Sequence, residues 1–227
     1  CVENGGVLRG SRLGDYLSKM CGRRDNRRNP VNKAMNVLDY DGANIGNHEF
    51  NFGLDFLAQP LVDAQFPYIS ASVFHADKPD QPYFEPYVIQ AKTVLDDSGK
   101  SHTLNIGYIG FVPPQIMQWD KANLEGKVIA KDIVDMAEHY VPQMKAAGAD
   151  LIIAIPHSGL DSTNRSGGDE NASYYLAQVE GIDAILFGHA HSTFPGNSRY
   201  DGLAGVDNEK GTILDVPAIM PGFWGNH

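Results

Sequence analysis

The sequence has few of the features that would place it in a specialised class of protein. Only two of its 227 residues are cysteines, Cys1 and Cys21, so neither a disulfide framework nor a cysteine-rich metal site is expected. Their spacing leaves open whether they pair with each other. No apolar run approaches the ~20 residues of a membrane-spanning helix, and we therefore expect no membrane partner. The 42% of hydrophobic residues is enough to build a buried core.

Basic residues are also scarce. Lysine and arginine number 18 against 28 aspartates and glutamates, which gives a net charge of −10. A negative field repels nucleic-acid polymers, so no DNA or RNA partner is expected. Residues 1–30 are the exception, with seven basic and three acidic side chains. Their arginine cluster, at positions 23, 24, 27 and 28, fits a solvated loop better than a phosphate-binding site.

Short apolar runs alternate with helical patterns along the chain, which is typical of an α/β fold. The apolar runs predict strands at 68–74, 87–95, 104–112, 151–155 and 182–187. Helices are predicted at 11–20, 30–38, 53–64, 131–147 and 171–179. The Pro- and Gly-rich stretches at 77–86, 113–126, 158–170 and 195–211 are predicted to be long loops, and loops of this length tend to carry function.

The helix predicted at 131–147 has a clear apolar stripe. Ile133, Ala137, Tyr140 and Met144 recur at helical spacing, with Met136 beside them, and this pattern predicts packing against a sheet. Pro142 interrupts the pattern, so we expect a kink or a break at that position.

Polar motifs follow three of the apolar runs. Gly46-Asn47-His48-Glu49 comes after residues 43–45, Pro156-His157-Ser158-Gly159 ends the run 151–155, and Gly188-His189-Ala190-His191 ends the run 182–187. The carboxyl ends of strands in an open α/β sheet lie along one edge, where ligands bind. The three motifs are therefore expected to meet.

Four histidines and one asparagine at a single edge predict a metal site. Neutral imidazole binds Zn, Mn, Fe, Co or Ni, and an Asn carbonyl adds an oxygen ligand. Because His189 and His191 are two residues apart, they could bind two neighbouring ions. Simpler interpretations exist for single residues: His157 as a hydrogen-bonded structural residue, Asn47 as a turn residue and Glu49 as an acid at a helix N-terminus. The remaining histidines are not part of a polar motif at the end of a predicted strand. We expect His75 and His102 in loops and His139 on a helix surface.

Together the three motifs resemble those of the calcineurin-like metallophosphoesterase family. Further runs resemble the bacterial branch of that family that hydrolyses 2',3'-cyclic nucleotides and 3'-nucleotides: residues 33–36, 107–117, 119–124 and 221–225. The resemblance implies a layered α/β/β/α sandwich with mixed central sheets and a nucleotide as small-molecule substrate. It also implies two divalent metal ions, for which Mn, Zn, Co or Fe are plausible.

The resemblance also implies roles for individual residues. Asn47, His157 and His189 resemble ligands of the second metal, and His191 resembles a ligand of the first. His48 resembles the catalytic histidine that protonates the leaving oxygen. Its partner is Asn51, where related 5'-nucleotidases often carry Asp, and an uncharged amide cannot stabilise an imidazolium by charge. No other substrate-binding residue is predicted.

The chain departs from the family pattern at its ends. Residues 1–227 read as one metallophosphoesterase catalytic domain without the first-strand Asp-x-His motif and without the C-terminal nucleotide-binding domain, which is the expected partner. Gly6 stands where the family has the Asp that bridges the two metals, and Glu3 is the nearest other carboxylate. This motivates an alternative hypothesis, a degenerate non-catalytic relative with a partial metal or phosphate site. Residues 1–10 show neither the basic leader nor the apolar segment of a signal peptide, and a periplasmic location, with a leader upstream of Cys1, is expected from the resemblance alone.

Overall fold

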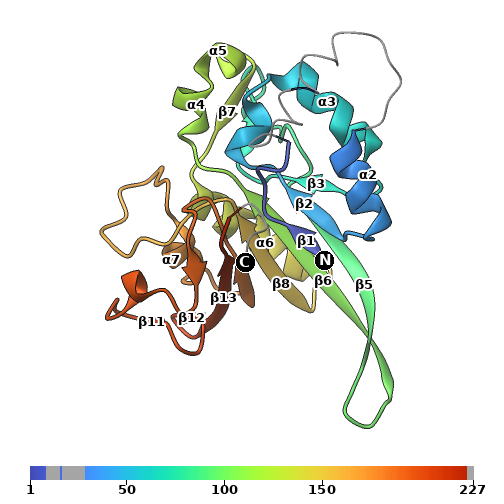
Figure 1. Cartoon of the computed structure of the whole chain (residues 1–227), viewed down its shortest axis with the longest axis vertical. Helices are drawn as coiled ribbons and strands as arrows, with labels where there is room; N and C mark the ends of the chain where they lie inside the picture. The colour runs from blue at the N-terminus through green and yellow to red at the C-terminus, as the bar shows by residue number, and fades with distance from the viewer. Residues whose placement is uncertain (9–15, 17–28, 224–227) are drawn as a thin grey trace.

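The structure of the chain is a computed structural model that describes residues 1–8, 16 and 29–223 (Figure 1). Several predictions lie outside the described residues: the helix at 11–20, the arginine cluster, the position of Cys21 and the end of the run 221–225. Among the described residues, no helix is long and apolar enough to cross a membrane.

Two sheets form the centre of the molecule. The smaller is parallel and has the order β1 (Val2–Glu3), β2 (Gly42–Asn44) and β3 (Tyr68–Ile69). The larger has eight strands in the order β11 (Val206–Asp207), β12 (Thr212–Ile213), β13 (Val216–Pro221), β9 (Ala184–Leu186), β8 (Leu151–Pro156), β6 (Ser101–Phe111) and β5 (Tyr87–Leu95), with β10 (Thr193–Phe194) paired to β13. It is mixed, because β13, β9, β8 and β6 are parallel to their neighbours in that series whereas β5 is antiparallel to β6.

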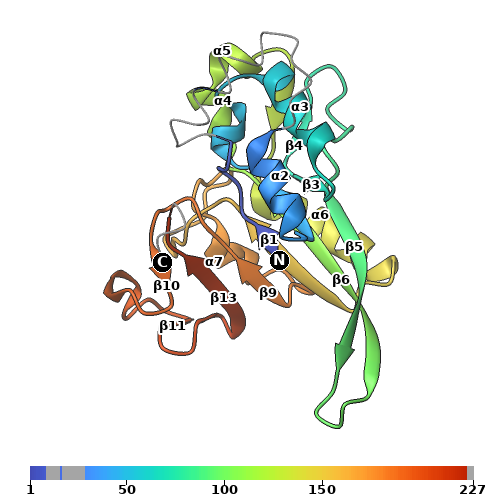
Figure 2. The ribbon, with the colours of Figure 1, turned by 45° about the vertical axis from the view of Figure 1, so that its right-hand side comes forward.

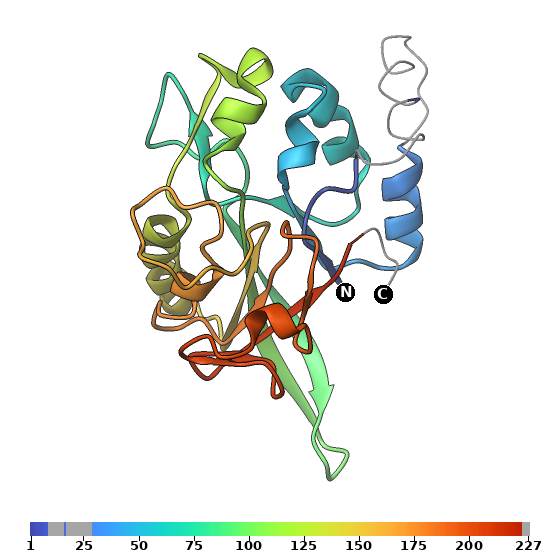
Figure 3. The same cartoon turned by 60° about the vertical axis from the view of Figure 1, so that its left-hand side comes forward.

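Helices cover the outer faces of both sheets. Helices α6 (Ile133–Ala146) and α7 (Ser173–Leu176) share a hydrophobic core with strands of the large sheet, and α2 (Pro30–Val37) and α3 (Leu54–Asp63) share another with β2. In Figure 3, α6 and α2 lie on opposite sides of the molecule. A third core lies between the sheets and contains Ile69, Tyr108 and Ile155. This is the expected α/β/β/α arrangement, but only the larger of the two central sheets is mixed, since the smaller is parallel.

The antiparallel pair β5 and β6 forms a long hairpin whose far end projects beyond the other elements (Figure 2). Nine residue pairs join the two strands, from Tyr87 opposite Ile109 to Leu95 opposite Ser101. The side chains of the far half are mostly exposed, whereas residues 107–111 are buried in the core. The predicted strands at 87–95 and 104–112 are confirmed, the second with an earlier start.

The single strand predicted at 68–74 is wrong. Two strands replace it: β3, and β4 (Val73–His75), which pairs with β7 (Val128–Ala130) in a separate two-stranded sheet. Between them, the Ser70 N–H donates to the carbonyl of Glu85. The Ser72 hydroxyl donates to the carbonyl of Val112 and accepts the N–H of the same residue. These bonds satisfy the backbone where the chain passes from one sheet to another.

The loop predicted at 113–126 is also wrong, because it contains the short helices α4 (Ile116–Trp119) and α5 (Lys121–Leu124). Ile116 and Leu124 are fully buried and fix this segment to the core. The helix predicted at 171–179 is reduced to α7. His75 and His102 lie on β4 and β6 rather than in loops.

Helix α6 confirms the predicted apolar stripe. Ile133, Ala137, Tyr140 and Met144 are buried, and Met136 is partly buried against the same core. Of the kink or break expected at Pro142, the break is absent, because the helix continues through this residue to Ala146. Packing of the helix on both sides of the proline offsets the one lost backbone hydrogen bond.

A pair of glycine substitutions tests how closely the two sheets approach each other. A Cβ added at Gly110 of β6 would lie 2.3 Å from Asn44 Oδ1 and 2.8 Å from the Ile69 carbonyl oxygen, whereas one at Gly42 would lie no closer than 3.6 Å to a neighbour. We expect Gly110→Ala to lower the free energy of unfolding by about 1–3 kcal/mol, because the interface cannot widen without cost. Gly42→Ala, the matched control, should change it little. Urea unfolding measures both, and equal effects would contradict the close packing.

Candidate active site

The three polar motifs meet at the carboxyl ends of β2, β8 and β9. Asn4, which follows β1, joins the two sheets there, because its Nδ2 donates to the carbonyl of Pro156 at 2.9 Å and to that of Leu186 at 2.7 Å. The Nδ2 of Asn44 donates in turn to the carbonyl of Asn4 at 3.1 Å and to that of Phe111 at 2.8 Å. The expected convergence of the motifs is therefore present in the fold.

Glu49 holds the loop after β1 against the loop after β2. Its carboxylate accepts the N–H groups of Gly6 at 2.6 Å, Gly46 at 2.8 Å and Leu8 at 3.0 Å. Burial raises the pKa of Glu49, although these three bonds act in the opposite direction. Glu49 does lie in the first turn of the short 3-10 helix Asn47–Phe50, as one interpretation of the sequence holds, but its carboxylate also joins two loops.

The two loops touch through their backbones. A Cβ at Gly5, whose φ is 106°, would lie 2.5 Å from the Gly46 nitrogen, so this approach requires a glycine. At Gly6, which has φ of 91°, a Cβ would lie 3.5 Å from Cε1 of His157. A side chain at position 6 would therefore face the histidine motifs, but glycine offers no ligand atom there.

His157 is held in one tautomer by the protein. Its Nδ1 lies 3.0 Å from the Asn4 carbonyl oxygen, which can only accept, so Nδ1 carries the proton. Burial, followed by the neighbouring His189, lowers the pKa of His157 to about 3, and the ring is neutral near pH 7. Its Nε2 lone pair is therefore directed at Oδ1 of Asn47, 2.9 Å away.

This contact brings together two atoms that both accept. Two ligands bound at right angles to one ion, each with a bond of about 2.1 Å, lie about 3 Å apart. The Asn47–His157 distance of 2.9 Å matches that separation, and both donors suit a divalent transition metal. The pair therefore fits one metal ion.

His189 lies beside this pair. Its ring centroid is 5.2 Å from that of His157, and Trp119 stacks on His189 with ring centroids 5.5 Å apart. Its Nε2 is 2.8 Å from Oε1 of Glu170, a contact that the sequence did not predict. His191, in contrast, is exposed and stacks on Phe223 at 5.5 Å. Asn47, His157 and His189 are thus brought together, while His191 contacts the end of the described chain.

The described residues offer no complete two-metal centre. Over residues 1–8 and 29–223, no group of three or more His, Cys, Asp or Glu side chains is arranged to hold a metal ion. Gly6 has no ligand atom, and the carboxylate of Glu3 accepts the N–H of Gly5 at 2.7 Å within its own turn. Burial and the nearby Glu49 raise the pKa of Glu3 to about 8. The residues fit one ion, at Asn47 and His157, but not two, and the predicted ligand roles stay predictions.

His48 and Asn51 form the expected pair. Nδ1 of His48 lies 2.8 Å from Oδ1 of Asn51. The Nδ2 of Asn51 then donates to both carboxylate oxygens of Asp120, at 2.9 and 3.0 Å. Asp120 is buried, with 7% of its surface exposed, and lies between α4 and α5. This contact is not predictable from the sequence, because it joins positions 69 residues apart.

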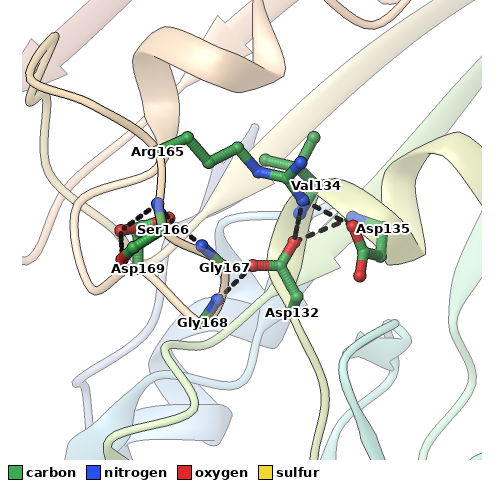
Figure 4. Close-up of polar contacts among 8 residues, drawn as sticks. All are labelled: Asp132, Val134, Asp135, Arg165, Ser166, Gly167, Gly168 and Asp169. Atoms are coloured by element: carbon green, nitrogen blue, oxygen red, sulfur yellow. Dashed lines mark hydrogen bonds and ion pairs between the residues drawn. The ribbon is translucent and has the colours of Figure 1, made fainter.

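The loop that carries Glu170 is fixed to the start of α6 (Figure 4). Asp132 caps the helix by accepting the N–H groups of Val134 and Asp135, each at 2.9 Å. The same carboxylate accepts a hydrogen bond from Arg165 at 2.7 Å and the N–H of Gly168. These bonds restrict the loop and keep Glu170 within reach of His189.

Comparison with known proteins gives a consistent result. The sequence pattern described as calcineurin-like phosphoesterase matches residues 13–193. The chain is 51% identical over 226 residues to the 2',3'-cyclic-nucleotide 2'-phosphodiesterase/3'-nucleotidase of Salmonella typhimurium and 52% identical to that of Yersinia enterocolitica. It matches along its whole length but spans only 34% of each of these relatives.

A solved structure matches equally well. The crystal structure of the calcineurin-like phosphoesterase YfkN from Bacillus subtilis superposes with a TM-score of 0.93 at 45% identity, over 99% of this chain and 67% of that one. The arrangement of sheets, helices and strand ends described above is therefore shared with a phosphoesterase.

Asp132 predicts how stability responds to acid. Burial alone would raise its pKa, but the hydrogen bonds from the Asp135 N–H, Arg165 and the Gly168 N–H outweigh it and lower the pKa. A carboxyl with a lowered pKa stabilises the fold above its unfolded pKa of about 4 and loses that contribution as the pH falls through the folded value.

Asp132→Asn keeps a side chain that can cap α6 but removes the charge beside Arg165. We expect it to lower the free energy of unfolding at pH 7 by up to about 1 kcal/mol and to reduce the loss of stability below pH 4. Urea unfolding at neutral and acidic pH measures both effects, with the exposed Asp80→Asn as control. An unchanged pH dependence would show that Asp132 is not the responsible group.

Proposed function

Because this chain belongs to the calcineurin-like phosphoesterase family, we propose that it forms the hydrolytic domain of a metal-dependent enzyme acting on 2',3'-cyclic nucleotides and 3'-nucleotides. The identity of 51–52% to two phosphodiesterase/3'-nucleotidases supports the choice of substrate. The observation that carries the proposal is the placement of His48 next to Asn47, whose side chain meets His157 in a pair that fits a metal ion.

The residues of the site have separate roles in the hydrolysis of a phosphate ester. Asn47 and His157, with His189 beside them, would hold the divalent ion. When bound, that ion supplies positive charge to the phosphate and lowers the pKa of the attacking water. Asn51 engages Nδ1 of His48, which leaves Nε2 available for the substrate. When both ring nitrogens are protonated, His48 gives its Nε2 proton to the ribose oxygen that leaves phosphorus, and the neutral ring that remains keeps its proton on Nδ1.

Three further parts of the proposal rest on sequence resemblance. The ion is Mn, Zn, Co or Fe, since imidazole and amide donors suit these metals. A second domain that binds the nucleotide follows the chain, which agrees with its coverage of 34% of the relatives. The protein acts in the periplasm.

Gly6 supports a second candidate function, a degenerate relative that binds metal or phosphate without catalysis. A glycine at this position removes the carboxylate that would join two ions. The match to named hydrolases along the whole chain supports the enzyme rather than this alternative. The two candidates differ in turnover.

Replacing the proposed acid tests the enzyme directly. We expect His48→Ala to lower the rate of hydrolysis of 2',3'-cyclic AMP by about 10²–10⁴-fold, since this is the usual contribution of a general acid. His139→Ala, on the exposed face of α6, is the matched control and should keep full activity. Product formation is followed by chromatography of the metal-loaded protein. Absence of turnover in the unmodified protein would favour the degenerate relative.

Metal content tests the ligand pair. After exposure to excess Mn or Zn and desalting, we expect about one ion per chain by mass spectrometry, because the described residues fit one ion. His157→Gln should lose it, whereas His102→Gln, exposed on β6, should retain it. Two ions per chain would mean that another group replaces the carboxylate missing at Gly6.

A further inference from the structure

We propose that Asp120 is a positioning residue for His48: its carboxylate fixes the Asn51 amide, and the amide fixes the tautomer of the imidazole. The inference rests on the proposed function, because it assigns a role within the same reaction. It concerns Asp120, which has no counterpart among the residues predicted from the sequence.

The three side chains form a continuous chain of hydrogen bonds. His48 Nδ1 lies 2.8 Å from Asn51 Oδ1, and Asn51 Nδ2 lies 2.9 and 3.0 Å from the two oxygens of Asp120. His48 and Asn51 are partly exposed, whereas Asp120 is buried. The accessible end of this chain is therefore the histidine, and the charged end lies inside the protein.

The carboxylate determines which way the amide of Asn51 is turned. An ionised carboxylate only accepts hydrogen bonds, so it must face the NH₂ group of Asn51. The amide oxygen then faces His48, and it too can only accept. Nδ1 of His48 must therefore carry a proton, which places the lone pair of the neutral ring on Nε2. The orientation of an amide is normally uncertain from its shape, but here the partner determines it.

This arrangement compensates for the replacement of a carboxylate by an amide at position 51. Asn51 has no charge to offer the imidazole, whereas related 5'-nucleotidases often have Asp at that position. In this chain the carboxylate of Asp120 lies one hydrogen bond further from His48. The Asn51 amide between them is oriented by that carboxylate and transmits part of its electric field to the imidazole.

Capping of α5 does not explain Asp120. Aspartate at the start of a helix usually accepts an N–H of the first turn with its side chain, but the Asp120 side chain makes no such bond. Its backbone carbonyl accepts the N–H groups of Asn123 and Leu124 instead. Asn123 also donates to the carbonyls of Phe50 and Asn51, both at 3.1 Å, so the segment holds residue 51 by backbone and side chain.

The buried charge also has a cost that the contact must offset. Among the ion pairs of the described residues, none includes Asp120, and its oxygens accept from a neutral amide. Burying a carboxylate without a cation is unfavourable for stability. A contribution to the orientation of His48 explains why the group occupies this position.

Exchanging the two side chains tests the proposal. Asp120→Asn should lower kcat by at least about tenfold with KM nearly unchanged, because the Asn51 amide is then free to turn and His48 loses its fixed tautomer. The double variant Asn51→Asp with Asp120→Asn restores an acceptor for His48 and a donor behind it. The double variant should recover most of the kcat lost in Asp120→Asn. A purely structural role instead predicts that the losses caused by Asn51→Asp alone and by Asp120→Asn alone add in the double variant. Full kcat in Asp120→Asn, or no recovery in the double variant, would overturn the proposal.

The tautomer is measured without metal or substrate. A long-range ¹H–¹⁵N spectrum of the metal-free protein at alkaline pH should show His48 protonated at Nδ1, with the signal assigned by its loss in His48→Gln. Asp120→Asn should shift this signal toward the other tautomer, and the double variant should restore it. If the signal behaves in this way but the unmodified protein hydrolyses nothing, the proposed function fails and the positioning role stands. If hydrolysis occurs and neither signal nor kcat depends on Asp120, the positioning role fails alone.

Discussion

The hydrogen bonds of Asn4 hold the two sheets and the histidine motifs in one arrangement. Its side chain closes the ends of β8 and β9, and its carbonyl receives both Asn44 and the Nδ1 proton of His157. An unpaired polar group at such a buried junction costs about 1–3 kcal/mol, so each partner depends on the others. The residue that joins the sheets also orients a predicted metal ligand. Stability and chemistry are therefore set by the same contacts.

A second constraint comes from the short segment that contains α4 and α5. Trp119 stacks on His189, and the next residue, Asp120, reaches His48 through Asn51. Two adjacent residues are thus linked to histidines from two motifs, Trp119 by direct stacking and Asp120 through Asn51. The buried side chains of Ile116 and Leu124 fix the segment to the core, so its position does not depend on the site itself. This packing allows a surface segment to position polar groups accurately.

The sequence predicts the parts that depend on local patterns. Strands β5, β6 and β8 and the stripe of α6 follow from periodicity, and the motif positions follow from strand ends. It does not predict Glu49, Asp120 or Glu170 in their observed contacts, because each of them has a partner that lies 19 to 69 residues away. The division of the strand predicted at 68–74 has the same cause, since the Ser72 hydroxyl is hydrogen-bonded to the backbone of Val112, which is distant in sequence. The metal-ligand roles stay predictions that the geometry supports at Asn47 and His157.

The wide spacing of the site along the chain has a consequence for folding. The β5–β6 hairpin closes between Leu95 and Ser101, whereas the contact of Asn47 with His157 spans 110 residues and that of Asn4 with Leu186 spans 182. Closing long loops costs more entropy, and contacts of high sequence separation form slowly. We therefore expect the hairpin to form early and the site to assemble only with the complete fold. Recovery of activity during refolding would then report the last step of folding rather than the first.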